Sequence, residues 1–231
     1  MTLSPRHLLP RLAPLLALLA VLALFAALIA PSGRLGSFLS LPNLQVLLHA
    51  NTIAGVAALG MLLVIVSGGI DLSVGSVVAL VTVVTMTAYN AVYVRTGSQL
   101  QASLAAVPLG VSAGGLCGLT NGLIIVLGRV RPFVATLGML SVARGVAIGL
   151  AGRQTINFAP GGRPGWVDLL AESESAYFLF SPGFWSLLLL AALAAVLLRW
   201  TVLGRHIYAV GGNEQAAWLC GVPVGRTKVI V

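Results

Sequence analysis

Residues 44–94 read LQVLLHANTIAGVAALGMLLVIVSGGIDLSVGSVVALVTVVTMTAYNAVYV, which is two long apolar runs, 44–66 and 74–94, separated by a short polar break. Each run suits a helix that crosses the hydrocarbon core of a bilayer, which takes about 20 residues. The sequence therefore predicts an all-α, polytopic transmembrane helix bundle in a single domain, residues 1–231, with about six spans. The other four runs are 12–30, 102–127, 133–151 and about 176–198. For the last run, Pro182 and Gly183 mark an alternative, later start.

The composition of the whole chain points to the same class. Of its 231 residues, 58% are hydrophobic and 8% are charged, whereas a soluble domain typically carries about 25% charged residues. Such a chain cannot cover a surface that faces water. With two cysteines, and with 27 glycines and 11 prolines that follow no period, it is neither a disulfide scaffold nor a collagen-like protein.

The net charge of +8, from 13 Lys and Arg against five acids, predicts topology rather than nucleic-acid binding. The basic residues are scattered at the ends of the runs and form no basic face. With the N-terminus in the cytoplasm, the inner side carries eight basic residues and the outer side four, as the positive-inside rule favours. A cleavable signal peptide at 12–30 is disfavoured, because that apolar run is too long. The inner set is Arg6, Arg11, Arg129, Arg131, Arg199, Arg205, Arg226 and Lys228.

Two connections differ from the rest of the chain. Segment 152–175 is rich in Gly and Pro and holds three of the five acids, which predicts an external loop with room for a short surface helix at 166–171. Segment 199–228 is polar by the standards of this chain and is expected in the cytoplasm. After Lys228 the chain turns apolar again. We expect a seventh span to begin there, and the chain to be a C-terminally truncated part of a longer protein.

Enzyme chemistry is not indicated. The sequence offers no nucleophile–base–acid set, no paired carboxylates and no Cys/His spacing for a metal, so no catalytic residue, metal or cofactor is expected. The glycine-rich residues 110–115 lie within an apolar run and lack the lysine of a phosphate loop; close helix packing explains them better. Any ATP hydrolysis must therefore come from another chain.

Polar groups inside the apolar runs are better candidates for a site, because a charge at the centre of a bilayer costs about 2.5–3.5 kcal/mol. Arg144 lies near the middle of the fifth run and is expected to face the bundle interior, paired with a carbonyl or an acid or lining a wet path. Asn121 lies about one helical turn from the inner end of the fourth run, where a helix–helix bond and a role in a substrate path are equally open. Asn51 lies near the outer end of the second run, where contact with water lowers the free-energy cost of placing a polar amide in a span.

The break at residues 67–75 (SGGIDLSVG) carries Gly69, Asp71, Ser73 and Gly75. Asp71 or Ser73 is suited to cap the next helix by accepting from its free backbone N–H groups, and the glycines permit a tight turn. This structural explanation accounts for the spacing without a substrate.

Residues 204–221 (GRHIYAVGGNEQAAWLCG) predict a short helix within the cytoplasmic segment. A double glycine interrupts regular secondary structure before this helix. Asn213 can cap the helix, and Glu214 lies in the first turn, where the helix dipole favours an acid. Gly221 supplies the stop. Such a helix suits docking into a groove of a partner, although an ordinary surface helix fits the same pattern.

Three stretches resemble the permease subunits of bacterial ribose/xylose-type ABC sugar importers. They are GIDLSVGS at 69–76, the motifs NGL, RPFVATLGM and ARG between 121 and 145, and the motifs GR, GGNE and G between 204 and 221. They follow the family's order and cover nearly the whole chain. The resemblance implies a multi-pass protein of the bacterial inner membrane that translocates a monosaccharide by alternating access.

The resemblance also implies partners. The positions Asn213, Glu214, Ala216, Ala217 and Gly221 resemble the coupling loop through which such permeases contact a separate ATP-binding subunit. The external segment would be offered to a periplasmic or extracellular sugar-binding protein. A second copy of the permease and the lipid bilayer complete the expected surroundings.

Two alternatives remain open, namely a self-sufficient channel or secondary carrier, and an inactive truncated fragment. An ion-coupled carrier usually places an acid at membrane depth, and Asp71, the nearest candidate, lies at the end of a span. A neutral sugar needs groups that form hydrogen bonds along its path. The candidates for that path are Asn51, Asn121 and Arg144.

Overall fold

The computed structural model describes residues 5–171 and 179–231, and these residues form helices and connecting segments without a strand. Six long helices each contain a segment that is long and apolar enough to cross a membrane, which confirms the expected all-α polytopic bundle. The first five expected runs each fall on one of the first five long helices. The six long helices are α1 (Pro5–Ile29), α3 (Leu41–Val66), α4 (Val74–Thr96), α5 (Gln99–Leu127), α6 (Pro132–Leu150) and α8 (Pro182–Trp200).

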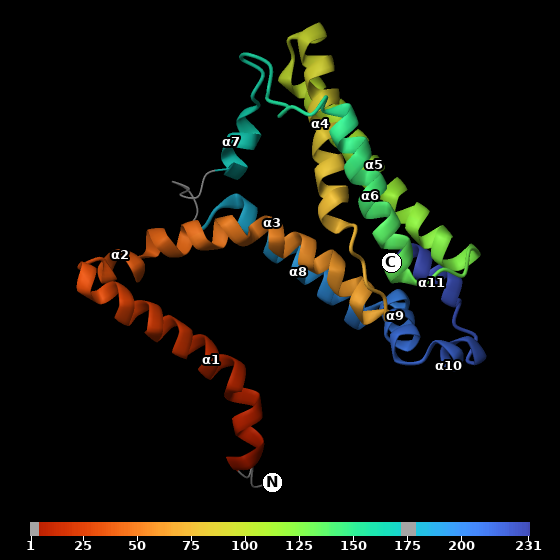
Figure 1. Cartoon of the computed structure of the whole chain (residues 1–231), viewed down its shortest axis with the longest axis horizontal. Coiled ribbons are helices and arrows are strands. Elements are labelled where there is room, and N and C mark those ends of the chain that lie inside the picture. Colours follow the sequence, from red (N-terminus) through yellow and green to blue (C-terminus); the bar gives the residue numbers. More distant parts are fainter. Residues whose placement is uncertain (1–4, 172–178) are drawn as a thin grey trace.

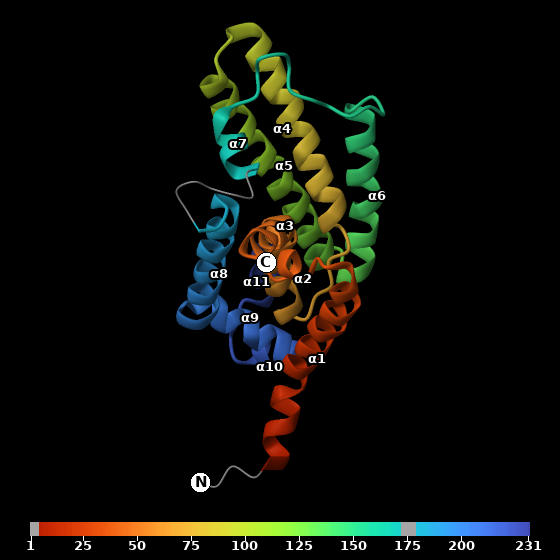
Figure 2. The ribbon, with the colours of Figure 1, turned by 90° about the vertical axis from the view of Figure 1, so that its left-hand side faces the viewer.

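The long helices form two arms (Figure 1). In one arm α3 lies beside α8; in the other, α4 packs against both α5 and α6 (Figure 2). Helix α1 stands away from both arms (Figure 1) and mainly contacts the short elements that follow it, η1 (Ala30–Ser32) and α2 (Leu35–Phe38). The short helices α9 (Val202–Gly212), α10 (Glu214–Leu219) and α11 (Val224–Ile230) gather where the two arms meet.

Small residues make the closest helix contacts. Ala143 and Ala147 of α6 are buried against Leu80 of α4, and Ala102 and Ala106 of α5 are buried against the same helix further along. Small residues let membrane helices approach closely, because lipid tails are as apolar as a leucine and packing must hold the helices together.

The sixth long helix starts later than the expected residue 176. Ser181 caps α8 by accepting from the backbone N–H of Phe184 at 3.3 Å, and proline follows at the first helical position, where its fixed backbone angle suits a helix start. The expected start, with the end of the expected 152–175 loop, lies outside the described residues. The short helix expected at 166–171 is confirmed as α7 (Gly165–Ala171).

Segment 199–228 contains three helices where one was expected. The double glycine at 211–212 does not interrupt the helix, because α9 continues to Gly212. The helix ends at Asn213, whose backbone is extended, with φ of −158°. Helix α11 already begins at Val224, before the apolar residues that follow Lys228. The short helix expected after Asn213 is confirmed as α10.

Candidate functional site

Asp71 shapes the turn between α3 and α4, residues 67–73. Its Oδ1 accepts from the backbone N–H of Ser73 at 2.7 Å and from the Ser73 hydroxyl at 2.6 Å. Ser73 is 1% exposed and precedes α4, but its own side chain makes no capping bond to the helix. The carboxylate thus accepts from the N–H of the residue before α4 and not from α4 itself, so the side-chain cap expected from Asp71 or Ser73 is not formed.

This turn is tied to the α5–α6 hairpin. The Asn121 amide donates from Nδ2 to the Ser73 hydroxyl at 3.3 Å, and the Thr136 hydroxyl donates to the carbonyl of Ile70 at 3.2 Å. Asn121 is 7% exposed, and its Oδ1 is buried without a hydrogen-bond partner in the described structure. Asn121 thus forms a structural bond to the turn before α4 rather than to another helix, and its role in a substrate path stays a prediction.

Glycines bring α9 and α11 into backbone contact with the rest of the bundle. A Cβ added to Gly211 would overlap the carbonyl group of Val66, and Gly68, with φ of +84°, lies against the Cα of Gly211. A Cβ on Gly122 of α5 would lie 2.9 Å from the Cα of Val229 in α11. These contacts require residues without a side chain. The double glycine in the sequence indicated a break before the short helix, whereas Gly211 is a packing contact in the structure.

Helix α10 has the caps that were expected. The Oδ1 atom of Asn213 accepts from the backbone N–H of Ala216 at 3.0 Å, and Gly221 ends the segment with φ of +80°. Glu214 in the first turn forms an ion pair of 2.7 Å with Lys228 of α11. No short-range pattern indicates this pair, because its members are 14 residues apart.

The two faces of α10 differ. Ala217 is 5% exposed and packs with Val210 and Val224, which attaches α10 to α9 and α11. Trp218 and Leu219 are 69% and 77% exposed. Large apolar side chains that stand out beside charged groups at the end of a bundle are typical of a surface that binds another protein.

A cavity of about 360 Å³ lies between the 67–73 turn, α5, the start of α6, and α9–α11. It brings together the expected residues Asp71 and Asn121 with Glu214 of α10. Within residues 5–171 and 179–231, no group of three or more His, Cys, Asp or Glu side chains is placed to hold a metal ion. Gly69, Gly118, Thr136, Asn213 and Lys228 also line this cavity.

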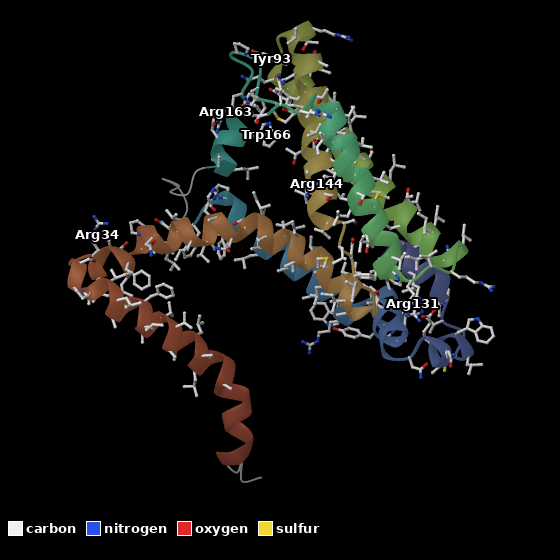
Figure 3. All side chains as sticks on the ribbon, in the orientation of Figure 1. Arg34, Tyr93, Arg131, Arg144, Arg163 and Trp166 are labelled. Atoms are coloured by element: carbon white, nitrogen blue, oxygen red, sulfur yellow. The ribbon has the colours of Figure 1, made fainter. Side chains whose placement is uncertain are left out.

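Two expected path residues lie elsewhere. Asn51 is exposed on α3 and donates to the carbonyl of Leu47 in its own helix at 2.8 Å. Arg144 is also exposed, so the expectation that it faces the bundle interior is wrong for the single chain: its neighbour Ala143 takes the buried face of α6. Figure 3 shows Arg144 well apart from Arg131 and the α9–α11 end. Gly75 lies in the first turn of α4 next to open space.

At the opposite end of the bundle, the segment 157–166 is fastened to α4. The buried Tyr89 donates its hydroxyl to the carbonyl of Gly162 at 2.6 Å. Asn90 donates to the carbonyl of Asn157 at 2.7 Å and accepts from the backbone N–H of Ala159 at 3.1 Å. No local sequence pattern indicates these hydrogen bonds, because each joins residues more than 65 positions apart.

The same segment is also attached to α5. Trp166 donates its indole N–H to the hydroxyl of Ser103 at 3.0 Å, and Arg163 forms an ion pair with Asp168 in α7. Figure 3 shows Tyr93, Arg163 and Trp166 gathered at this end. The start of the expected external loop is thus an ordered segment held by side chains.

Six helices that are long and apolar enough to cross a membrane, with a capped short helix at one end, define a polytopic membrane protein. Residues 43–231 match the family described as "Branched-chain amino acid transport system / permease component", and the chain belongs to this family. It is a multi-pass inner-membrane protein of a family whose members are described as transporter permease components.

Three of the proteins similar to this chain are permeases whose names state what they transport. It is 34% identical over 210 residues to the L-arabinose ABC transporter permease of Azospirillum brasilense (91% of this chain, 57% of the relative). It is 32% identical over 225 residues to the ribose import permease of Escherichia coli K12 (94% and 63%). It is 36% identical over 214 residues to the autoinducer 2 import system permease of Enterobacter sp. strain 638 (93% and 57%). The chain thus spans less than two thirds of each relative. No solved structure matches it.

Proposed function

We propose that this chain is the membrane-spanning permease subunit of an ATP-driven importer that translocates a monosaccharide by alternating access. The observation that carries the proposal is its similarity, over more than nine tenths of its length, to permeases named for the transport of L-arabinose and ribose. The α9–α11 end would face the cytoplasm, in line with the excess of basic residues predicted there.

Helix α10 is the proposed contact with a separate ATP-binding subunit. Its buried Ala217 anchors it to the bundle, while Trp218 and Leu219 are free to enter a groove on that partner. The caps at Asn213 and Gly221 set its length. A second permease copy and a sugar-binding protein at the α7 end would complete the transporter.

Motion of α10 has a direct route into the bundle. Helix α9 precedes α10 and touches the 67–73 turn through Gly211. That turn is hydrogen-bonded to α5 through Ser73 and Asn121. A shift of α10 on closure of the ATP-binding subunits would therefore move the start of α4 relative to α5, and such a step alters access between the two arms.

The test is reconstitution in vesicles with an ATP-binding subunit and a sugar-binding protein of an importer of this family. Glu214→Ala and Gly221→Ala are expected to lower sugar-stimulated ATP hydrolysis about tenfold, which corresponds to roughly 1.4 kcal/mol of lost interaction. Gly97→Ala is the matched control, since Gly97 also has a positive φ, of +66°, but ends α4 away from α10. Unchanged hydrolysis in the two α10 variants would contradict the coupling role. Sugar flux through the chain alone, without nucleotide, would indicate a channel or secondary carrier.

The family description also suggests a second cargo class, the branched-chain amino acids. The same vesicles distinguish the two: competition of uptake by D-ribose or L-arabinose supports the sugar, and competition by L-leucine supports the amino acid. The relatives' names favour the sugar.

A further inference from the structure

The cavity at the α9–α11 end contains a buried polar atom that the described chain does not satisfy. Asn121 is 7% exposed and donates from Nδ2 to Ser73, but its Oδ1 has no partner. An unpaired buried acceptor costs about 1–3 kcal/mol. Since Asn121 lines the cavity, a hydrogen-bond donor placed there would recover this free energy.

The other lining groups narrow the chemistry of such a donor. Asp71 bonds Ser73 through Oδ1 and borders the cavity, while Thr136 adds a hydroxyl. The ammonium of Lys228 is paired with Glu214, so Asp71 is the lining carboxylate without a cation beside it. The lining therefore disfavours an anion and offers two acceptors, Asn121 Oδ1 and the Asp71 carboxylate, to a ligand that carries several hydroxyl donors.

The volume of the cavity suits a small-molecule ligand. Its volume of about 360 Å³ lies within the range of roughly 300–1,000 Å³ that small-molecule sites occupy. The lining includes Asn213 and Glu214 of the proposed coupling segment. An occupant would therefore contact both the 67–73 turn and the start of α10.

We propose that this cavity is a binding site for a neutral, hydroxyl-rich small molecule of the monosaccharide class, within one permease chain and on its cytoplasmic side. Asn121 Oδ1 is the anchoring acceptor and Asp71 the second one. The proposal rests on the proposed function for the identity of the ligand. It adds that sugar accumulated in the cytoplasm occupies this site, holds α10 against the bundle, and so slows the ATP-driven cycle.

Thiol labelling of the full chain in detergent tests the site. Gly118 lines the cavity, and a Cβ there meets nothing within 4 Å, so Gly118→Cys is sterically allowed. The native thiols are removed as Cys117→Ala and Cys220→Ser. D-ribose or L-arabinose is expected to slow N-ethylmaleimide labelling about fivefold at about four times its Kd.

Gly115→Cys is the matched control. Gly115 lies on the same helix in open space and does not line this cavity, so its labelling rate is expected to be the same with and without sugar. Adding Asn121→Leu, which keeps a side chain of similar size without the amide, is expected to abolish protection at Gly118→Cys. Unchanged control labelling in that background shows that the helix is still folded.

Three results would overturn the site. They are an unchanged labelling rate at Gly118→Cys in sugar, equal protection by sodium chloride alone, and protection that survives Asn121→Leu. Sugar uptake by the reconstituted importer separates this proposal from the one it rests on. If sugar is taken up but does not protect Gly118→Cys from labelling, the cavity site alone is rejected. If there is neither uptake nor protection, the sugar-import function is rejected as well.

Discussion

The two ends of the bundle are held together by different kinds of contact. At the α7 end, side chains of α4 and α5 bind the backbone of residues 157–166, and Tyr89 packs edge-on to Phe158 with ring centroids 5.3 Å apart. At the α9–α11 end, backbone touches backbone at Gly211 and Gly122. The ion pair there joins partly exposed side chains.

This difference indicates which end moves. A buried tyrosine hydrogen bond and aromatic packing fix one relative position, because several atoms must separate together. Glycine contacts permit close approach without interlocking side chains, so elements joined in this way can slide past one another. We therefore expect the α7 end to keep its shape during transport, and α9–α11 to shift against the 67–73 turn.

The strongest test of this contrast is Gly211→Ala. A methyl group there overlaps the carbonyl of Val66, so α9 must move away from the turn. Overpacking of this kind costs about 1–3 kcal/mol, and we expect a loss near the top of that range in detergent-induced unfolding. Gly212→Ala is the control, because its Cβ meets nothing within 4 Å. Equal stability of the two variants would show that the contact is not close.

Tyr89→Phe tests the fixed end. The variant keeps the ring but leaves the carbonyl of Gly162 without its donor, which is expected to cost about 1–2 kcal/mol. Hydrogen exchange of residues 157–166 should rise while exchange in α9–α11 stays unchanged. Tyr93→Phe, on the ring stacked 6.1 Å from Tyr89, is the comparison and should change exchange much less. A similar rise in both variants would argue against the hydroxyl as the anchor.

Local patterns in the sequence predicted the local features of this fold. Apolar length predicted the six spans, and the asparagine–glycine spacing predicted α10 with its caps. These features depend on neighbours along the chain, where spacing and propensity act directly. The start of α8 lies at the later of its two expected positions, because the Ser181 cap and Pro182 start the helix there although the residues before them are also apolar.

The contacts between distant segments were not predictable in this way. The bond from Asn121 to Ser73 spans 48 residues, and the position of Gly211 against Val66 depends on how α9 folds back. Arg144 was expected inside because it is charged, yet the neighbouring alanine fits the tight α4–α6 contact and the larger arginine is turned outward. Side-chain volume, rather than charge, decides which face of α6 is buried.

Asn213→Ala is expected to have a smaller effect than the two changes above. It removes the side-chain bond to the backbone N–H of Ala216, and the loss of an N-cap typically costs about 1 kcal/mol. Because α10 has only six residues, fraying should appear as faster proteolysis near Trp218 rather than as a lower stability of the whole bundle. Asn213→Asp, which keeps an acceptor at this position, should restore the protection. If Asn213→Ala is cut no faster, the cap does not hold α10.

The smallest expected effect is that of the ion pair between Glu214 and Lys228. The two side chains are 54% and 23% exposed, and pairs exposed to solvent contribute about 0.2–1 kcal/mol. A double-mutant cycle with Glu214→Gln and Lys228→Met should therefore give a coupling free energy of about 0.5 kcal/mol that falls as salt is added. A coupling above about 2 kcal/mol that resists salt would mean that the pair locks α10 to α11. It would also mean that α9–α11 is as fixed as the α7 end, since a movable α10 needs contacts that a partner subunit can break.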